Sequence, residues 1–316
     1  MPYIDIFNGD ADGILALHQL RLTNPHKSRL ITGVKRDTKL LQYALSTHGS
    51  VITVLDISFH VNREPLLQLL NQGNTIHYFD HHFAGKIVEN SLFHSHIDTS
   101  PSVCTSILVD RYLEGKYRLW AVAAAFGDNL HSPALQLAES LKLDLKKTEK
   151  LRELGELINY NSYGETIDDL HFSPKTLFMA LHPFADPFDF IETSLELKHL
   201  RRGFRSDMRK AGEKHTLRQS SVGRIFLFPN DAWSRRVSGT FINQVARESP
   251  ELAHAILVER TDGTFLVGVR APIARPYGAD TLCLKFSGGG RVAAAGINHL
   301  APEDIECFFD TFEKQF

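Results

Sequence analysis

Short apolar runs alternate with amphipathic segments along the first half of the chain. The runs are rich in β-branched and aromatic residues, as strands are, and they cover residues 3–7, 29–34, 51–55 and 75–79. The segments between them repeat apolar residues at helical spacing, over residues 14–22, 39–47 and 61–71. This alternation predicts βαβ units around a parallel sheet. Further helices are expected to cover the sheet at residues 103–113, 134–158 and 174–182.

The pattern changes in the last third of the chain, where strands follow one another closely. Strands are expected at residues 223–228, 254–259 and 264–270, and helices at residues 237–247 and 302–314. Asp262-Gly263 is typical of a hairpin turn. We therefore predict an α/β protein with an N-terminal parallel-sheet domain at residues 1–190, a charged helical linker at residues 191–219 and a smaller C-terminal α/β domain at residues 220–316.

Polar groups follow several apolar runs at the point where each run ends. They are Asp10 and Asp12 after the first run, Asp56 after the third, Asp80, His81 and His82 after the fourth, and Asp128 after the run that begins at Leu119. In open parallel sheets ligands bind outside the carboxyl ends of the strands, so side chains far apart in the sequence are expected to meet there. Alone, the motifs at Asp10, Asp56 and Asp128 are more commonly turns or helix caps, whereas Asp80-His81-His82 is about equally a structural feature or a metal site. Four such endings together predict a metal site.

The pattern suits two cations rather than one. Asp10 and Asp12 flank Ala11 just before Gly13, which permits a bent backbone from which both carboxylates reach one pocket. A bridging carboxylate, which we assign to Asp56, would hold two cations about 3.5–4 Å apart. Mixed Asp and His ligation favours Mn²⁺, with Mg²⁺, Co²⁺ or Zn²⁺ as alternatives.

Composition limits the classes of partner. The 316 residues contain 43% hydrophobic and 23% charged residues, as in an ordinary soluble protein, and no apolar run of about 18 residues that would predict a membrane span. Three scattered cysteines, Cys104, Cys283 and Cys307, indicate reduced thiols and a cytoplasmic location. A net charge of −2 argues against long duplex nucleic acid as a partner. The oligomeric state stays open, with a homodimer as one option.

A second motif lies near the C-terminus. Gly288, Gly289 and Gly290 expose consecutive backbone N–H groups, and the small residues after them suit a helix N-terminus or close packing against an anion. Arg291 can donate two hydrogen bonds to a phosphate, and Arg270 ends a preceding strand. A bare run of glycines is more often a flexible turn, so the prediction of a phosphate site depends on the two arginines.

The four carboxylate motifs resemble those of the DHH phosphoesterase superfamily, which includes RecJ exonuclease, nanoRNases, cyclic-dinucleotide phosphodiesterases and exopolyphosphatases. The resemblance implies that one Mn²⁺ is held by Asp12, Asp56, His81 and Asp128, and a second by Asp10 with bridging Asp56. It implies that His82 contacts the scissile phosphate or assists the leaving group, and that Asp80 orients the histidines. The chain departs from the family at Ile6, where many members carry a histidine, so the half-site around Asp10 has fewer protein ligands. Lys35 and Arg36 could reach the same edge, but a solvated turn is the favoured interpretation.

The glycine motif resembles the DHH-associated C-terminal domain, whose signature is Gly-Gly-Gly-His followed by Ala-Ala-Gly. Here Arg291 replaces the histidine, and Arg270 matches an arginine that binds the non-scissile end of the substrate in this family. This C-terminal type makes the manganese pyrophosphatases of the superfamily a poorer match.

Together the motifs predict a metal-dependent phosphodiesterase with its active site in the cleft between the two domains. The expected reaction cuts very short RNA or a linear dinucleotide, such as pGpG, to mononucleotides by attack of a metal-activated water. An exopolyphosphatase or nucleoside-bisphosphate phosphatase is one alternative, and a cyclic-dinucleotide phosphodiesterase is another. A nucleotide-binding regulatory module without turnover is the alternative outside enzymes. A nucleotide substrate requires a stacking surface, for which the candidates are Trp233, Tyr277 and Phe286.

Overall fold

A computed structural model describes all residues from Met1 to Phe316, and the chain divides into two units, Met1–Arg202 and Gly203–Phe316. The division falls inside a single helix, α9 (Leu195–Gly212), which lies within the predicted linker. The last residues of that predicted linker have another role, because Thr216–Gln219 form strand β6 of the second sheet. No helix is both long and apolar enough to cross a membrane.

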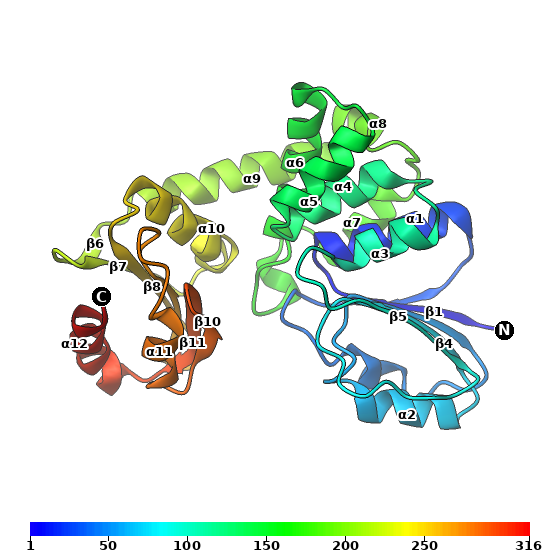
Figure 1. Ribbon diagram of the computed structural model, residues 1–316, viewed down its shortest axis with the longest axis horizontal. Helices are drawn as coiled ribbons and strands as arrows, with labels where there is room; N and C mark the ends of the chain where they lie inside the picture. The colour runs from blue at the N-terminus through cyan, green and yellow to red at the C-terminus, as the bar shows by residue number, and fades with distance from the viewer. The chain divides into compact units, whose positions relative to one another are not determined.

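The first unit is built on a five-stranded parallel sheet, which confirms the predicted fold class (Figure 1). In the order β2-β1-β3-β4-β5 its strands are Arg29–Ile31, Tyr3–Phe7, Val51–Leu55, Thr75–Asp80 and Phe93–Ile97. The sequence did not predict β5, because polar residues interrupt its apolar pattern in Phe-His-Ser-His-Ile. Strands β1, β3 and β4 are neighbours, so their carboxyl ends lie side by side.

Helices cover both faces of this sheet. Even-numbered strand residues such as Ile6, Val54 and Tyr78 pack in a buried cluster with α2 (Arg63–Asn71) and the short helix η1 (Leu40–Ala44). The opposite face carries α1 (Ala11–Thr23) and α3 (Thr105–Tyr112) (Figure 1). Ile6, at the position where many members of the family carry a histidine, is fully buried in this apolar cluster.

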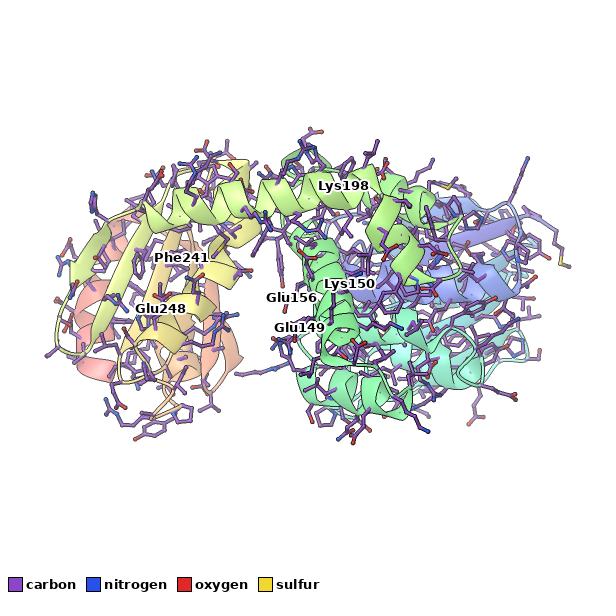
Figure 2. All side chains as sticks on the ribbon, turned by 90° about the horizontal axis from the view of Figure 1, so that it is seen from above. Glu149, Lys150, Glu156, Lys198, Phe241 and Glu248 are labelled. Atoms are coloured by element: carbon purple, nitrogen blue, oxygen red, sulfur yellow. The ribbon has the colours of Figure 1, made fainter.

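Further helices continue from α1 and α3. They are α4 (Arg118–Gly127), α5 (His131–Ser140), α6 (Leu145–Tyr160), α7 (Pro174–Leu181) and α8 (Pro187–Thr193). The predicted helix over residues 134–158 is therefore two helices, α5 and α6, and the apolar run before Asp128 is helix α4. In Figure 2 the labelled Glu149, Lys150 and Glu156 extend from α6 and Lys198 from α9. Arg201 of α9 donates two hydrogen bonds to Glu153 of α6, at 2.6 and 2.8 Å.

The second unit is built on a six-stranded mixed sheet. In the order β10-β11-β9-β8-β7-β6 its strands are Gly289–Arg291, Ala294–Leu300, Phe265–Arg270, Ala253–Glu259, Gly223–Phe228 and Thr216–Gln219. Its helices are α10 (Ala232–Glu248), α11 (Ala279–Leu284), the short η3 (Pro302–Asp304) and α12 (Ile305–Gln315). The turn at Asp262-Gly263 is confirmed, since Gly263 has φ +81° and donates to the carbonyl of Arg260.

The glycine motif differs from its predicted form. The apolar run before it belongs to helix α11, and the glycines lead into strand β10 rather than into a helix. Strand β10 pairs antiparallel with β11, so the small residues after Arg291 form a hairpin and a strand instead of a helix N-terminus.

Candidate metal centre and basic strand row

Four segments distant in the sequence bring Asp12, Asp56, His81 and Asp128 together. Nε2 of His81 lies 3.3 Å from Asp56 Oδ1, 3.9 Å from Asp128 Oδ2 and 4.0 Å from Asp12 Oδ2. One ligand atom each from Asp12, His81 and Asp128 fall within 4.8 Å of one another. Asp12 and Asp56 are buried, whereas His81 and Asp128 remain about one-fifth exposed, so the cluster opens to solvent on one side.

The turn into helix α1 positions the first two carboxylates. Asp10 caps the helix, and its Oδ1 accepts hydrogen bonds from the backbone N–H groups of Asp12 and Gly13 at 3.0 and 3.1 Å. Asp12 lies in the first turn, and its two oxygens accept from the N–H groups of Thr105 and Ser106 at 2.7 and 2.6 Å. Those groups belong to the start of helix α3, which favours negative charge. Each Asp12 oxygen keeps a second lone pair for a cation.

Asp128 arrives from the end of helix α4 through a close contact between helices. A Cβ on Gly127 would lie 2.5 Å from the Cβ of Ala11 and 2.7 Å from the carbonyl oxygen of Gly155 in α6. The missing side chain therefore lets α4 approach α1 between Asp10 and Asp12. The carboxylate of Asp128 stands at a helix C-terminus, where the helix dipole disfavours it, so nearby cations are needed to stabilise it.

Asp80 holds both histidines at the end of β4. Its Oδ1 accepts from the N–H groups of His81 and His82, at 2.9 and 3.2 Å, and lies 2.6 Å from Nδ1 of His82. Its Oδ2 accepts from the N–H of Phe59 at 3.1 Å. An ionised carboxylate only accepts, so Nδ1 of His82 carries the proton and Nε2 is left as the acceptor. Asp56, His81 and His82 also form a group with metal-ligand spacing, but the Asp80 bond makes Nδ1 of His82 a poor ligand.

Asp10 faces a residue that the sequence analysis set aside. Nζ of Lys35 lies 2.6 Å from Asp10 Oδ2, 3.1 Å from Asn159 Oδ1 and 3.7 Å from Asp128 Oδ1. The interpretation of Lys35 as part of a solvated turn is wrong, because its side chain is only 29% exposed. A topological signal could have identified it, since Lys35 follows β2, the strand that pairs with β1.

Burial and electrostatic interactions among these side chains shift their pKa values. Burial, together with Asp10 and Asp12, raises the pKa of Asp56 well above its usual value. Burial and Asp12 raise the pKa of Asp128 to about 6. Burial alone would lower the pKa of His81, but Asp56, Asp12 and Asp128 raise it to about 10. For Lys35, Asp10 likewise outweighs burial and raises the pKa well above 10.5.

This chemistry fits a divalent cation. Three carboxylates and one imidazole, packed closely enough to raise the pKa values of Asp56 and Asp128, would be relieved of mutual repulsion by a shared cation. Their oxygen and nitrogen donors suit Mn²⁺ and the related ions Mg²⁺, Co²⁺ and Zn²⁺. The residues that would hold such an ion are Asp12, Asp56, His81 and Asp128.

In the second unit, basic side chains form a row across the sheet. Arg270 of β9 pairs with Ala294 of β11, and Ala294 pairs with Arg291 of β10, so the two arginines project from the same face. Their backbones are separated by two strand spacings, about 10 Å. His254 of β8 and Arg224 of β7 follow in the same register, but burial lowers the pKa of His254 to about 4, so the positive charge of the row comes from its arginines. Nε of Arg270 donates to Oδ1 of Asn243 in α10 at 2.7 Å, which fixes its guanidinium.

The glycines and the aromatic candidates divide into packed and exposed positions. A Cβ on Gly288 would lie 2.3 Å from the carbonyl oxygen of Gly296, whereas Gly289 has open space around it and Gly290 takes φ +145°. Phe286 packs on Phe308 at 5.6 Å between ring centroids, and Trp233 on Phe228 at 5.1 Å. Tyr277 is 61% exposed and is the most exposed of the three stacking candidates.

The chain thus combines a parallel α/β sheet, which carries an Asp and His cluster at its carboxyl edge, with a second unit built on a mixed sheet. No family model matches the chain, and no curated protein matches it in sequence. Solved structures do match over its whole length. Exonuclease RecJ bound to manganese has 15% identity and a TM-score of 0.62, covering 99% of this chain and 89% of that one.

Two further structures show the same likeness. RecJ from Thermus thermophilus in complex with Mn²⁺ has 13% identity and a TM-score of 0.58, and covers 99% of this chain and 51% of that one. The pGpG-specific phosphodiesterase PggH from Vibrio cholerae has 13% identity and a TM-score of 0.56, with 100% of both chains covered. At these identities the likeness concerns the fold. The chain has the fold of the DHH phosphoesterase superfamily, as its motifs predicted.

Proposed function

We propose that this protein is a divalent-metal-dependent phosphodiesterase that hydrolyses very short RNA or a linear dinucleotide such as pGpG to mononucleotides. The observation that carries the proposal is the convergence of Asp12, Asp56 and Asp128 on Nε2 of His81 within 4.0 Å. The shared fold with RecJ and PggH supports phosphoester chemistry. Mn²⁺ is the favoured cofactor, with Mg²⁺ or Co²⁺ as alternatives.

The side chains around the cluster have distinct roles in this proposal. A bound divalent cation supplies Lewis acidity at the phosphate and lowers the pKa of water. His82, oriented by Asp80 through Nδ1, turns Nε2 toward the substrate, and in its imidazolium form the Nε2–H group donates to the phosphate or gives its proton to the leaving oxygen. Asp80 also receives the N–H groups of both histidines, so it positions the imidazoles without contacting the substrate.

The second unit supplies the proposed substrate contacts. Arg270 and Arg291, on one face and about 10 Å apart, suit two phosphate groups of a short anion. The backbone N–H groups around Gly289 add donors where no side chain blocks the approach of a ligand. A net charge of −2 supports a short substrate over a long polymer.

The exposed ring of Tyr277 allows a test that distinguishes nucleotide substrates from polyphosphate. A nucleotide enzyme gains from stacking a base on Tyr277, which is 61% exposed, whereas polyphosphate offers nothing to stack. Under the proposal, Tyr277→Ala raises KM for pGpG and leaves the hydrolysis of bis(p-nitrophenyl) phosphate, a diester without a base, unchanged. An unchanged KM for pGpG would remove Tyr277 from the proposed base site.

One panel of substrates tests the function. Protein with Mn²⁺ is incubated with pGpG, RNA of about 10 nucleotides, cyclic di-GMP and polyphosphate, and the products are separated by anion-exchange chromatography. We expect GMP from pGpG at a rate well above that of the other three. Preferred cleavage of polyphosphate or of the cyclic dinucleotide would replace the proposal with the corresponding alternative. Binding without turnover would favour a regulatory module.

A further inference from the structure

The ammonium group of Lys35 occupies the half-site in which the family resemblance places a second metal. Its Nζ lies 2.6 Å from Asp10 Oδ2 and 3.7 Å from Asp128 Oδ1. The other oxygen of Asp128 faces His81 at 3.9 Å, so Asp128 divides its two oxygens between the lysine and the Asp12–His81 side of the cluster. Asp10 belongs to neither of the two groups of side chains with metal-ligand spacing.

The backbone around Lys35 is fixed from both sides. The carbonyl of Lys35 accepts from Nδ2 of Asn8 at 3.1 Å, and its N–H donates to the carbonyl of Ser162 at 3.0 Å. A Cβ on Gly9 would lie 1.9 Å from the carbonyl oxygen of Gly33, so the segment before Lys35 packs directly on the turn that carries Asp10. None of these contacts involves a side chain of the metal cluster, and together they position the Lys35 side chain beside Asp10.

Both oxygens of Asp10 are already engaged. Oδ1 receives the N–H groups at the start of helix α1, and Oδ2 receives the Lys35 ammonium. A divalent ion bound to Oδ2 would sit about 2–2.2 Å from it. Such an ion would compete with Nζ for one position and repel its charge. The position of Ile6 in the apolar core removes the imidazole that would otherwise strengthen this half-site.

We propose that Lys35 takes the place of the second cation, so that the protein binds one divalent ion per chain, at Asp12, Asp56, His81 and Asp128. The inference rests on the proposed function, because it takes this cluster as a metal centre. Lys35 then gives the centre a fixed positive charge beside Asp10 that is not lost when metal is scarce.

Metal stoichiometry tests the inference without reference to turnover. Full-length metal-free protein is titrated with MnCl₂ by isothermal titration calorimetry, and the bound Mn²⁺ is examined by electron paramagnetic resonance. We expect one ion per chain and the six-line spectrum of an isolated Mn²⁺. Two ions per chain, with the exchange-coupled spectrum of a close pair, would overturn the inference.

Variants assign the effect to the lysine. Lys35→Met removes the charge and leaves Asp10, Asp56 and Asp128 in place, so we expect the stoichiometry to rise from one ion to two. Lys39→Met, which changes an exposed lysine of the same segment, should keep one ion. A stoichiometry of one in K35M would also overturn the inference. If circular dichroism shows that K35M is unfolded, Lys35→Gln replaces it and retains a donor for Asp10.

The stoichiometry test of this inference and the substrate test of the proposed function can fail independently of each other. One ion per chain in a protein that cleaves none of the four substrates would keep the inference and defeat the phosphodiesterase. Two ions per chain in a protein that cleaves pGpG would overturn the inference and support the phosphodiesterase.

Discussion

Individual side chains in the cluster hold conformations and charges that only the surrounding structure stabilises. Asp56 takes a left-handed backbone conformation, φ +58°, at the end of β3, which is uncommon outside glycine. Its N–H donates to the carbonyl of Phe79 at 3.0 Å, which holds the turn. Its Oδ1 accepts from the hydroxyl of Thr105 at 3.3 Å. The strain is consistent with a backbone that is bent to aim a carboxylate at His81.

Removal of His81 is expected to remove the metal. His81→Ala takes away the imidazole that lies nearest to three carboxylates, so we expect Mn²⁺ affinity to fall by about 100-fold or more and pGpG turnover to be lost. Calorimetry and the chromatographic assay measure the two effects. His48→Ala, at an exposed position, is the control. Full turnover by the H81A variant in a metal-replete assay would contradict the proposed site.

Metal binding is expected to release protons. In the metal-free protein the pKa of His81 is about 10, so its imidazole is protonated at pH 7 and must lose that proton to bind a cation. The pKa of Asp128 is about 6, so a second proton is released when binding takes place below that pH. Mn²⁺ affinity should therefore rise about tenfold or more per pH unit between pH 7 and 9, and more steeply below pH 6, with the raised pKa of Asp56 adding to the slope. Calorimetry in buffers of different ionisation enthalpy counts the protons, and a pH-independent affinity would contradict these assignments.

The same shifts predict how the stability of the metal-free protein depends on pH. Both groups have pKa values raised above their ordinary values, 3.8 for Asp128 and 6.5 for His81, so each stabilises the fold in its protonated form. The contribution of Asp128 is present below about pH 4 and lost as the pH rises through about 6. That of His81 is lost as the pH rises through about 10. Thermal melts should therefore show that Mn²⁺ stabilises the protein more at pH 8 than at pH 6.

At the scale of elements, two close helix contacts set the distance between the carboxylates. Helix α4 meets α1 at Gly127 and Ala11, and it meets α6 at Gly127 and Gly155. A Cβ on Gly155 would lie 1.8 Å from the carbonyl oxygen of Ala123, so the backbones of α4 and α6 touch there. The position of Asp128 therefore depends on glycines that offer no side chain to the metal site.

A methyl group at this contact should damage both stability and metal binding. Gly127→Ala places a Cβ where Ala11 and the backbone of Gly155 leave no room, so α4 must shift and carry Asp128 away from His81. We expect a loss of roughly 1–3 kcal/mol in the free energy of unfolding. Mn²⁺ affinity should also fall, as measured by calorimetry.

The matched control is a helical glycine without neighbours. Gly239→Ala, within α10 and with no atom within 4 Å of the added Cβ, should stabilise the protein by about 0.5–1 kcal/mol. Equal effects of the two substitutions would show that helix propensity, rather than close packing, decides the result at Gly127.

At the scale of the whole molecule, the two units carry different halves of the proposed chemistry. The first unit holds the carboxylates and histidines, and the second holds the basic row on a separate sheet. Each unit has its own buried core, with a cluster around Ile6 and Tyr78 in the first and around Leu257 and Phe308 in the second. Substitutions in one unit should therefore leave the local structure of the other unchanged.

This separation predicts that Arg270 affects substrate binding without affecting the metal. Arg270→Ala removes a guanidinium fixed by Asn243, so KM for pGpG should rise about 10- to 100-fold, the loss of one charge-assisted hydrogen-bonding group. The Mn²⁺ stoichiometry should not change. Arg218→Ala, at a surface arginine that pairs with Glu306, serves as the control. A change in Mn²⁺ stoichiometry in R270A would contradict the separation.

The sequence by itself determined most of the strands and the residues that could bind a metal. Strands β1 and β3 were predicted at their observed bounds, and β4 within one residue, because a buried parallel strand is a short apolar run that ends where polar residues begin. Since neighbouring parallel strands end at one edge, Asp12, Asp56 and His81 could be placed together before their distances were known. The DHH fold followed from the same motifs.

Only the tertiary structure decided which charges share the cluster. The run before Asp128 was not assigned to an element from its sequence, and its close contact as helix α4 depends on Gly127 and on Gly155 in α6. The hairpin of β10 and β11 could not be predicted from the sequence, because its small residues show no clear hydrophobic periodicity. Lys35 is the clearest case, because a lysine after a strand is usually solvated. Its burial against Asp10 depends on contacts from Asn8 and Ser162, which sequence spacing does not disclose.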